Sequence, residues 1–183
     1  MFSTRFLISL FELTLMIGAS GVLIVLIYRL FIRANPDFNM EEAIRQGNAA
    51  VGILMAAIMI CAAQMLSRGL EASVGVFRLA MSAPGDKGTQ LAQAVLLIGG
   101  HMVLSLAIAV LTISVTLRLF GRLAKRVNPQ MHLGELLEAG NVAVGILLAA
   151  VVFIATLYVG EGVSAVTKAL VPQPSVGTIQ IMR

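Results

Sequence analysis

Four long apolar runs separated by short polar stretches dominate the pattern of hydrophobic and polar positions along the chain. The runs cover about residues 6–28, 47–67, 91–117 and 140–160. About 20 residues of continuous helix are enough to cross a hydrocarbon core about 30 Å thick. The pattern therefore predicts an all-α, polytopic membrane protein with four transmembrane helices.

A motif that occurs twice adds an internal order to these runs. Its copies consist of Arg29, Arg33, Asn35, Pro36, Glu42, Gly47 and Asn48 in the first half, and of Arg122, Arg126, Asn128, Pro129, Glu135, Gly140 and Asn141 in the second. Matching positions lie about 93 residues apart with no gap. Such a fixed period indicates a duplicated structural unit.

The motif predicts two repeats of two helices each, residues 1–90 and 91–183. Two spans return the chain to its starting side, so we expect the repeats to be parallel and related by a pseudo-twofold axis along the membrane normal. The stretch from about 69 to 90 is either a continuation of the second helix or an interfacial amphipathic segment, which residues 83–86 then break. The fourth helix is expected to continue until Pro172, before a loosely structured tail.

Turns inside each hairpin are expected at the two Asn-Pro pairs, Asn35-Pro36 and Asn128-Pro129. Proline disfavours the helical conformation in the residue before it, so each pair is a natural end for the preceding helix. The first apolar run is too long for the core of a typical signal peptide. We therefore expect it to be an uncleaved first span.

Composition agrees with the membrane class. Hydrophobic residues make up 58% of the chain and charged residues 12%, with a mean hydropathy of +0.95. In soluble domains hydrophobic residues average about 45–50% and charged residues about 25%. The net charge of +4 does not indicate nucleic-acid binding, because the basic residues lie at the ends of apolar runs, where membrane proteins carry their anchors. Cys61 is the single cysteine and cannot form an intrachain disulfide.

The basic residues also predict an orientation. Those beside the hairpin turns are denser at helix ends than those on the opposite side, so the positive-inside rule places the turns in the cytoplasm and both termini outside. Arg29 and Arg33, like Arg122 and Arg126, share a helix face at i, i+4 spacing. Contact with anionic lipid headgroups explains these pairs well; a specific phosphate site is the weaker alternative.

Small residues and an asparagine form one stripe in each copy of the motif. Asn48, Gly52 and Ala56 follow each other at i, i+4 and i+8, and Asn141, Gly145 and Ala149 repeat the spacing. Small-xxx-small patterns let helices approach closely in lipid, and an asparagine beside them can hydrogen-bond across the contact. These positions, with Gly47 and Gly140, are expected to pack the second helix against the fourth. The alternative is that the two amides line a path for an ion or solute.

Two positions carry opposite charges in the two copies. Arg45 corresponds to Glu138, and Arg68 corresponds to Glu161. Equivalent positions of parallel repeats sit at equivalent depths, so Arg45–Glu138 and Arg68–Glu161 are predicted as interfacial ion pairs. The alternative is that each side chain extends to water by itself and contributes little.

Glu12 and His101 are the ionisable residues inside predicted spans. A charged side chain near the centre of a span costs about 2.5–3.5 kcal/mol on insertion scales, so such residues usually face the interior of a bundle. The two residues could share a proton along a transport path. The simpler interpretation is that Glu12 is hydrated near the surface and His101 hydrogen-bonds a neighbouring helix.

Catalytic signatures are missing from the sequence. It has no glycine-rich phosphate loop, no HExxH, no cysteine cluster and no serine-nucleophile motif. His132 has no companion for a metal site. We therefore expect no enzyme activity, no cofactor and no metal.

The sequence Gly-Asn-x-x-Val-Gly-Ile-Leu opens an apolar helix twice, at Gly47-Asn48 and at Gly140-Asn141, each time after an acidic residue. This motif, its period and the helix count resemble the domain-of-unknown-function 350 family, whose YjfL-type members carry two copies of a two-helix unit. The resemblance implies a four-helix protein of the bacterial inner membrane. It implies no activity and no functional residues.

Two functional classes follow from these features. The first is a non-catalytic scaffold or accessory subunit that self-associates or binds a membrane partner, with the lipid bilayer around it. Small residues on the first and third helices suit such contacts: Gly18, Gly21, Gly99 and Gly100. The second is a small channel or proton-coupled transporter with a polar path along the repeat interface.

Overall fold

The computed structural model describes residues 2–33, 39–82 and 87–170, and this part of the chain is helical with no strand. The elements are α1 (Phe2–Ile27), a π-helical turn η1 (Tyr28–Arg33), α2 (Met40–Arg45), α3 (Ala49–Ser82), α4 (Lys87–Val127), α5 (Leu133–Glu138) and α6 (Val142–Leu170). Four of the helices are long and apolar enough to cross a membrane. The predicted all-α class with four membrane-crossing helices is confirmed.

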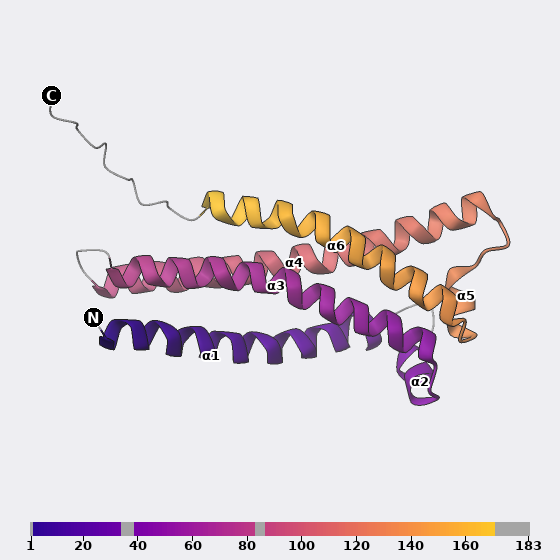
Figure 1. The fold of residues 1–183 in the computed structure, drawn as a ribbon, viewed down its shortest axis with the longest axis horizontal. Coiled ribbons are helices and arrows are strands. Elements are labelled where there is room, and N and C mark those ends of the chain that lie inside the picture. Colours follow the sequence, from indigo (N-terminus) through magenta and orange to yellow (C-terminus); the bar gives the residue numbers. More distant parts are fainter. Residues whose placement is uncertain (1, 34–38, 83–86, 171–183) are drawn as a thin grey trace, which may run out of the picture.

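The long helices run lengthwise and alternate in direction, while the short helices α2 and α5 lie together at one end (Figure 1). α3 is the central helix and packs against α1, α4 and α6. More than half of its apolar window is buried (56%), against 17% for α1. α1 is thus attached mainly through α3 at the edge of the bundle.

Two helices are much longer than a bilayer requires. α3 has 34 residues and α4 has 41, which correspond to about 50 Å and about 60 Å at about 1.5 Å per residue. The stretch after residue 69 is therefore a continuation of the second predicted helix as far as Ser82, the first of the two alternatives. The predicted break at 83–86, the turn at Asn35-Pro36 and the tail after Pro172 lie outside the described residues.

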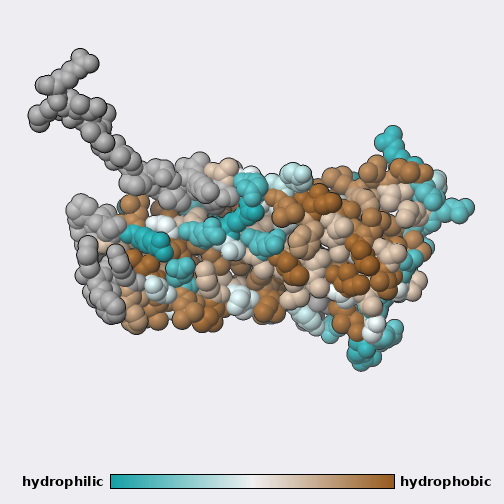
Figure 2. Space-filling view, viewed as in Figure 1, coloured by the Kyte–Doolittle hydropathy of each residue, from teal (hydrophilic) through white to brown (hydrophobic). Residues whose placement is uncertain are grey.

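The surface of the bundle is largely apolar. Figure 2 shows hydrophobic residues over most of its length, with hydrophilic residues at the end where α2 and α5 lie and in a strip across the other half of this face. Large side chains are exposed along α1 and α4, with Ile17 64%, Leu96 78% and Val103 69% exposed. Soluble monomers rarely expose apolar surface on this scale, whereas helices that cross a bilayer do. The chain is a multi-pass membrane protein.

One core joins the two halves of the sequence. Val51, Leu54 and Ile58 of α3 are buried in the same cluster as Val144 and Val152 of α6. The second and fourth predicted helices are therefore neighbours, and α4 completes the cluster with Ile113. Among the described residues, each of the core clusters contains side chains from both halves of the chain.

Candidate functional site

The repeated Gly-Asn pair forms the same backbone corner at the start of α3 and of α6. Gly47 and Gly140 have φ angles of +79° and +81°, the left-handed conformation that glycine adopts without strain. The backbone amide of Asn48 donates to the carbonyl of Ala43 at 2.9 Å. In the second copy the backbone amide of Asn141 donates to the carbonyl of Leu136, also at 2.9 Å. This is a Schellman-type helix end, which explains why the motif contains glycine.

The side chain of Asn48 connects the two halves of the chain. Its Oδ1 accepts a hydrogen bond from the amide of Val51 at 3.1 Å and so caps α3. Its Nδ2 donates to the carbonyls of Leu137 and Glu138, both at 3.0 Å, where α5 ends. One side chain thereby satisfies a free donor of α3 and bonds to two carbonyls at the end of α5, of which that of Leu137 also accepts from the backbone amide of Gly140.

Asn141 has the equivalent position but fewer bonds. Its side chain is exposed, and its Oδ1 accepts from the amide of Val144 at 3.3 Å. No hydrogen bond from Asn141 to the first half is found among the described residues. The two copies of the motif therefore have the same backbone and different side-chain roles.

The two small-residue stripes also differ in their burial and in their contacts with the other helix. Gly145 is buried, and a Cβ built on it would lie 2.6 Å from the carbonyl oxygen of Ala50, so α6 touches the backbone of α3 at this point. Gly52 and Ala56 are exposed, and a Cβ on Gly52 would meet nothing within 4 Å. Ala149 is half-buried.

The packing of α3 against α6 thus departs from the predicted stripe-to-stripe contact on the α3 side. α3 lies between three helices, and its bulkier apolar residues Val51, Leu54 and Ile58 fill the shared core. The small residues of its stripe are left on the outer surface.

Arg68 of α3 and Glu161 of α6 lie face to face. Arg68 Nη2 and Glu161 Oε1 are 3.0 Å apart, and the side chain of Arg68 is 24% exposed, against 77% for Glu161. The guanidinium also lies over Gly160, where an added Cβ would be 3.2 Å from Arg68 Cζ. A glycine at this position lets the arginine cross the surface of α6 and reach its carboxylate.

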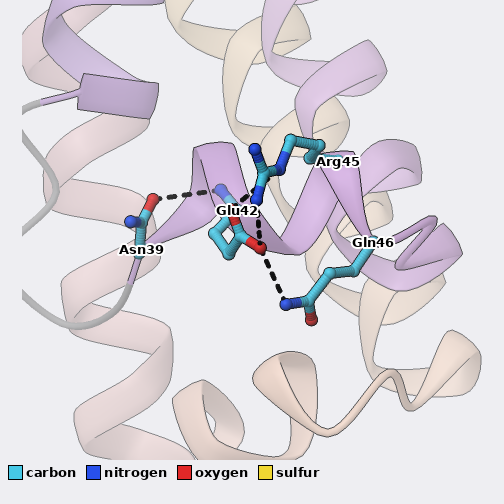
Figure 3. A network of polar contacts seen from close by, with 4 residues as sticks. All are labelled: Asn39, Glu42, Arg45 and Gln46. Carbon is cyan, nitrogen blue, oxygen red and sulfur yellow. Dashed lines mark hydrogen bonds and ion pairs between the residues drawn. The ribbon is translucent and has the colours of Figure 1, made fainter.

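Arg45 has a local partner instead of Glu138. Its Nε lies 3.0 Å from Glu42 Oε2, one turn earlier on α2. Glu42 also accepts from Gln46 Nε2 at 2.9 Å, and its amide donates to Asn39 Oδ1 at 3.0 Å, so four residues form one network (Figure 3). A pair at i, i+3 needs no long-range approach and is favoured over a partner on another element. The predicted Arg45–Glu138 pair is not found between these two described residues.

Glu12 and His101 lie in different surroundings. Glu12 Oε2 is 3.6 Å from Arg78 Nη2 on α3, beside a stacked pair of rings, Phe11 and Phe77, whose centroids are 4.0 Å apart. The sequence does not predict this contact, because Glu12 and Arg78 are not at equivalent positions of the two repeats. His101 of α4 is only 4% exposed, and its Nε2 has no hydrogen-bond partner among the described residues.

A close approach of α3 and α4 lies one turn from His101. A Cβ on Gly69 would collide with the hydroxyl of Ser105 and would lie 3.3 Å from the carbonyl oxygen of His101. Ser105 is fully buried, and its Oγ has no hydrogen-bond partner in the described part of the chain. His101 and Ser105 are thus two buried polar groups on one face of α4.

The model of one protein family matches the chain: Domain of Unknown Function (DUF350) matches residues 5–163, from α1 into α6. The chain belongs to the DUF350 family. The resemblance inferred from the Gly-Asn motifs is thereby confirmed. No curated protein and no solved structure matches the chain. The family has no assigned function, and no catalytic family is indicated.

Three of the four arginines predicted to contact lipid headgroups in this DUF350 protein are at the surface. Arg29, Arg122 and Arg126 are exposed, and the side chain of Arg33 lies outside the described residues. No group of three or more His, Cys, Asp or Glu that could hold a metal ion occurs in residues 2–33, 39–82 and 87–170. Cys61 is buried in the core that α3 shares with α6.

Proposed function

We propose that this DUF350 protein is a non-catalytic scaffold or accessory subunit of the bacterial inner membrane. One observation carries the proposal: the side-chain amide of Asn48 makes three hydrogen bonds, one that caps α3 and two that join the start of α3 to the end of α5. An amide engaged in this way supports a structural role over a transport role. The non-enzymatic character is part of the same proposal.

Other polar groups inside the bundle also have structural partners. Arg68 faces Glu161, and Arg78 faces Glu12, so both arginines of the long helix α3 have a counter-charge from a neighbouring helix. Such pairs reduce the cost of charges at membrane depth. They support a bundle whose polar residues fix the positions of α1 and α6 on α3.

A surface for association is present on α3. Gly52, Ala56, Ala63 and Ser67 are all exposed and recur along one face of the helix. In lipid, faces of small residues let a second helix come close enough for extensive van der Waals contact. We infer that another transmembrane helix, from a second copy or from a partner, packs on this face.

Site-specific photocrosslinking in native membranes tests this inference. A benzoylphenylalanine at Ala56 is expected to give a discrete crosslinked protein band, at twice the mass for self-association or at another mass for a partner. The control is the same probe at Leu13, which is 57% exposed on α1, outside the small-residue face. Crosslinking at Ala56 no stronger than at Leu13 would contradict the proposal.

Membrane placement belongs to the same proposal. We place the α2 and α5 end in the cytoplasm, with two parallel repeats related by an axis along the membrane normal. The dense basic residues of that end support the orientation through the positive-inside rule, and the identical corners at Gly47 and Gly140 support the repeat arrangement. Fusion of a cytoplasm-active reporter at Gln130 tests the orientation, since activity is expected only with a cytoplasmic turn.

A small channel or proton-coupled transporter is the second candidate function. The buried, unpartnered Nε2 of His101 and Oγ of Ser105 favour it, because a water chain would satisfy both groups. Proton flux into proteoliposomes, followed with a pH-sensitive dye, should then occur and be lost in His101→Ala. Flux equal to that of empty liposomes would remove this candidate.

A further inference from the structure

A groove opens at the α2 and α5 end of the bundle, between α4 and α5. Its volume is about 360 Å³, within the range of small-molecule sites. Its floor is apolar and comes from three long helices, with Leu54 of α3, Leu117 of α4 and Leu148 of α6. Leu133 and Leu137 of α5 form the opposite wall.

Basic residues line one side of this groove. Arg118, Arg122 and Lys125 all line it, and their i, i+4 and i+7 spacing puts them on one face of α4. All three side chains are exposed, and none forms an ion pair within the described part of the chain. The groove therefore combines three unpaired cations with a long apolar floor.

Two carboxylates lie close by and limit where an anion fits. Glu135 and Glu138 line an adjacent hollow of about 340 Å³, which shares Gly121, Lys125, Leu133 and Gly134 with the groove. Lys125 is therefore flanked by negative charge on one side. Arg118 and Arg122 do not line that hollow, so they present the strongest site for an anion.

We propose that the groove binds one anionic diacyl phospholipid. The phosphate lies against Arg118 and Arg122, whose guanidinium groups suit bidentate hydrogen bonding to phosphate oxygens. Lys125 adds a third positive charge, and an acyl chain lies on the leucine floor. This site goes beyond the proposed scaffold role and does not depend on it.

The choice of occupant follows from the two surfaces together. A free phosphate or a soluble anion would use the cations and leave the apolar floor uncovered. A zwitterionic lipid would cover the floor without matching the three positive charges. An anionic lipid satisfies both surfaces, and it is available at the membrane boundary where the apolar run of α4 ends.

Native mass spectrometry of the delipidated protein, titrated with dioleoyl phosphatidylglycerol, tests the proposal. The wild type is expected to retain one lipid. Arg118→Gln with Arg122→Gln should weaken retention about 30-fold, which corresponds to about fivefold for each basic residue removed. Arg126→Gln is the matched control, because Arg126 has the same charge on the same helix end and does not line the groove.

A steric variant gives an independent test. An added Cβ on Gly134 meets nothing within 4 Å, so Gly134→Ala should leave binding unchanged. Gly134→Trp places a large ring in the groove and should abolish retention of the lipid while all three basic residues remain. If the double arginine variant fails to fold, as judged by loss of helical circular dichroism, the tryptophan variant decides the question.

Three results would overturn the proposal. A loss of about fivefold in Arg126→Gln, the share of one charge, would mean diffuse attraction to the basic end of the bundle. Equal retention of dioleoyl phosphatidylcholine would mean an apolar groove without headgroup selection. Displacement of the lipid by millimolar inorganic phosphate would mean a site for small anions.

Discussion

Replacement of Asn48 by alanine should destabilise the bundle far more than the same change at Asn141. The Asn48 side chain caps α3 at 3.1 Å and donates to two carbonyls of α5 at 3.0 Å each. Loss of an N-cap costs about 1 kcal/mol, and a hydrogen bond between transmembrane elements contributes about 0.6 kcal/mol. The free energy of unfolding should therefore fall by about 2 kcal/mol in Asn48→Ala.

The matched variant Asn141→Ala removes a single capping bond at 3.3 Å. Its cost should be no more than about 1 kcal/mol. Asn48→Asp is a sharper test, because it keeps the capping oxygen and replaces the donor nitrogen by an oxygen facing two carbonyls. It should be at least as destabilising as Asn48→Ala.

The assay is reversible unfolding in mixed micelles, followed by helical circular dichroism, with the three variants measured side by side. Equal losses in Asn48→Ala and Asn141→Ala would refute the assignment of the inter-repeat bonds to Asn48. A neutral Asn48→Asp would refute the donor role of its Nδ2.

Two further predictions concern helix contacts. Gly145→Ala places a methyl group against the backbone of Ala50, so it should lower the free energy of unfolding by about 1–3 kcal/mol. Gly52→Ala changes the equivalent position, which faces open space, so it should be neutral or stabilise the helix by up to about 1 kcal/mol. Equal effects of the two changes in the same unfolding assay would contradict the observed packing. The double variant Arg68→Glu with Glu161→Arg exchanges the two charges and should restore part of the free energy of unfolding that each single change loses. The coupling energy should be about 0.2–1 kcal/mol, because Glu161 is largely exposed. A double-mutant cycle without coupling would show that the two side chains extend to water independently.

The four spans could be predicted from the sequence because about 20 continuous apolar residues have few alternatives to a membrane helix. Gly47 and Gly140 could be singled out because they recur in both copies of the motif, but the reason for glycine there is the left-handed corner and not the predicted helix packing. Which face of α3 packs against the other helices could not be predicted. Lipid tails and the protein interior are equally apolar, so hydrophobicity does not tell whether Gly52 points outward or inward.

Partners of charged residues were predictable only in part. Opposite charges at equivalent repeat positions pointed to Arg68 and Glu161, which lie 3.0 Å apart. The same reasoning missed that Arg45 has Glu42 one turn away on its own helix. The Glu12–Arg78 contact and the groove beside Arg118 depend on how far α3 and α4 extend, which the apolar runs alone did not define.

Solvent access to Cys61 tests most directly whether the contact between α3 and α6 excludes water. The native thiol is fully buried in the shared core, so no substitution is needed. A membrane-impermeant maleimide should leave Cys61 unlabelled in intact membranes and label it after denaturation. A cysteine at Gln130, exposed in the second turn, serves as the reactive control. Labelling of Cys61 in the folded protein from either side would reveal an aqueous path along this contact and contradict the scaffold proposal.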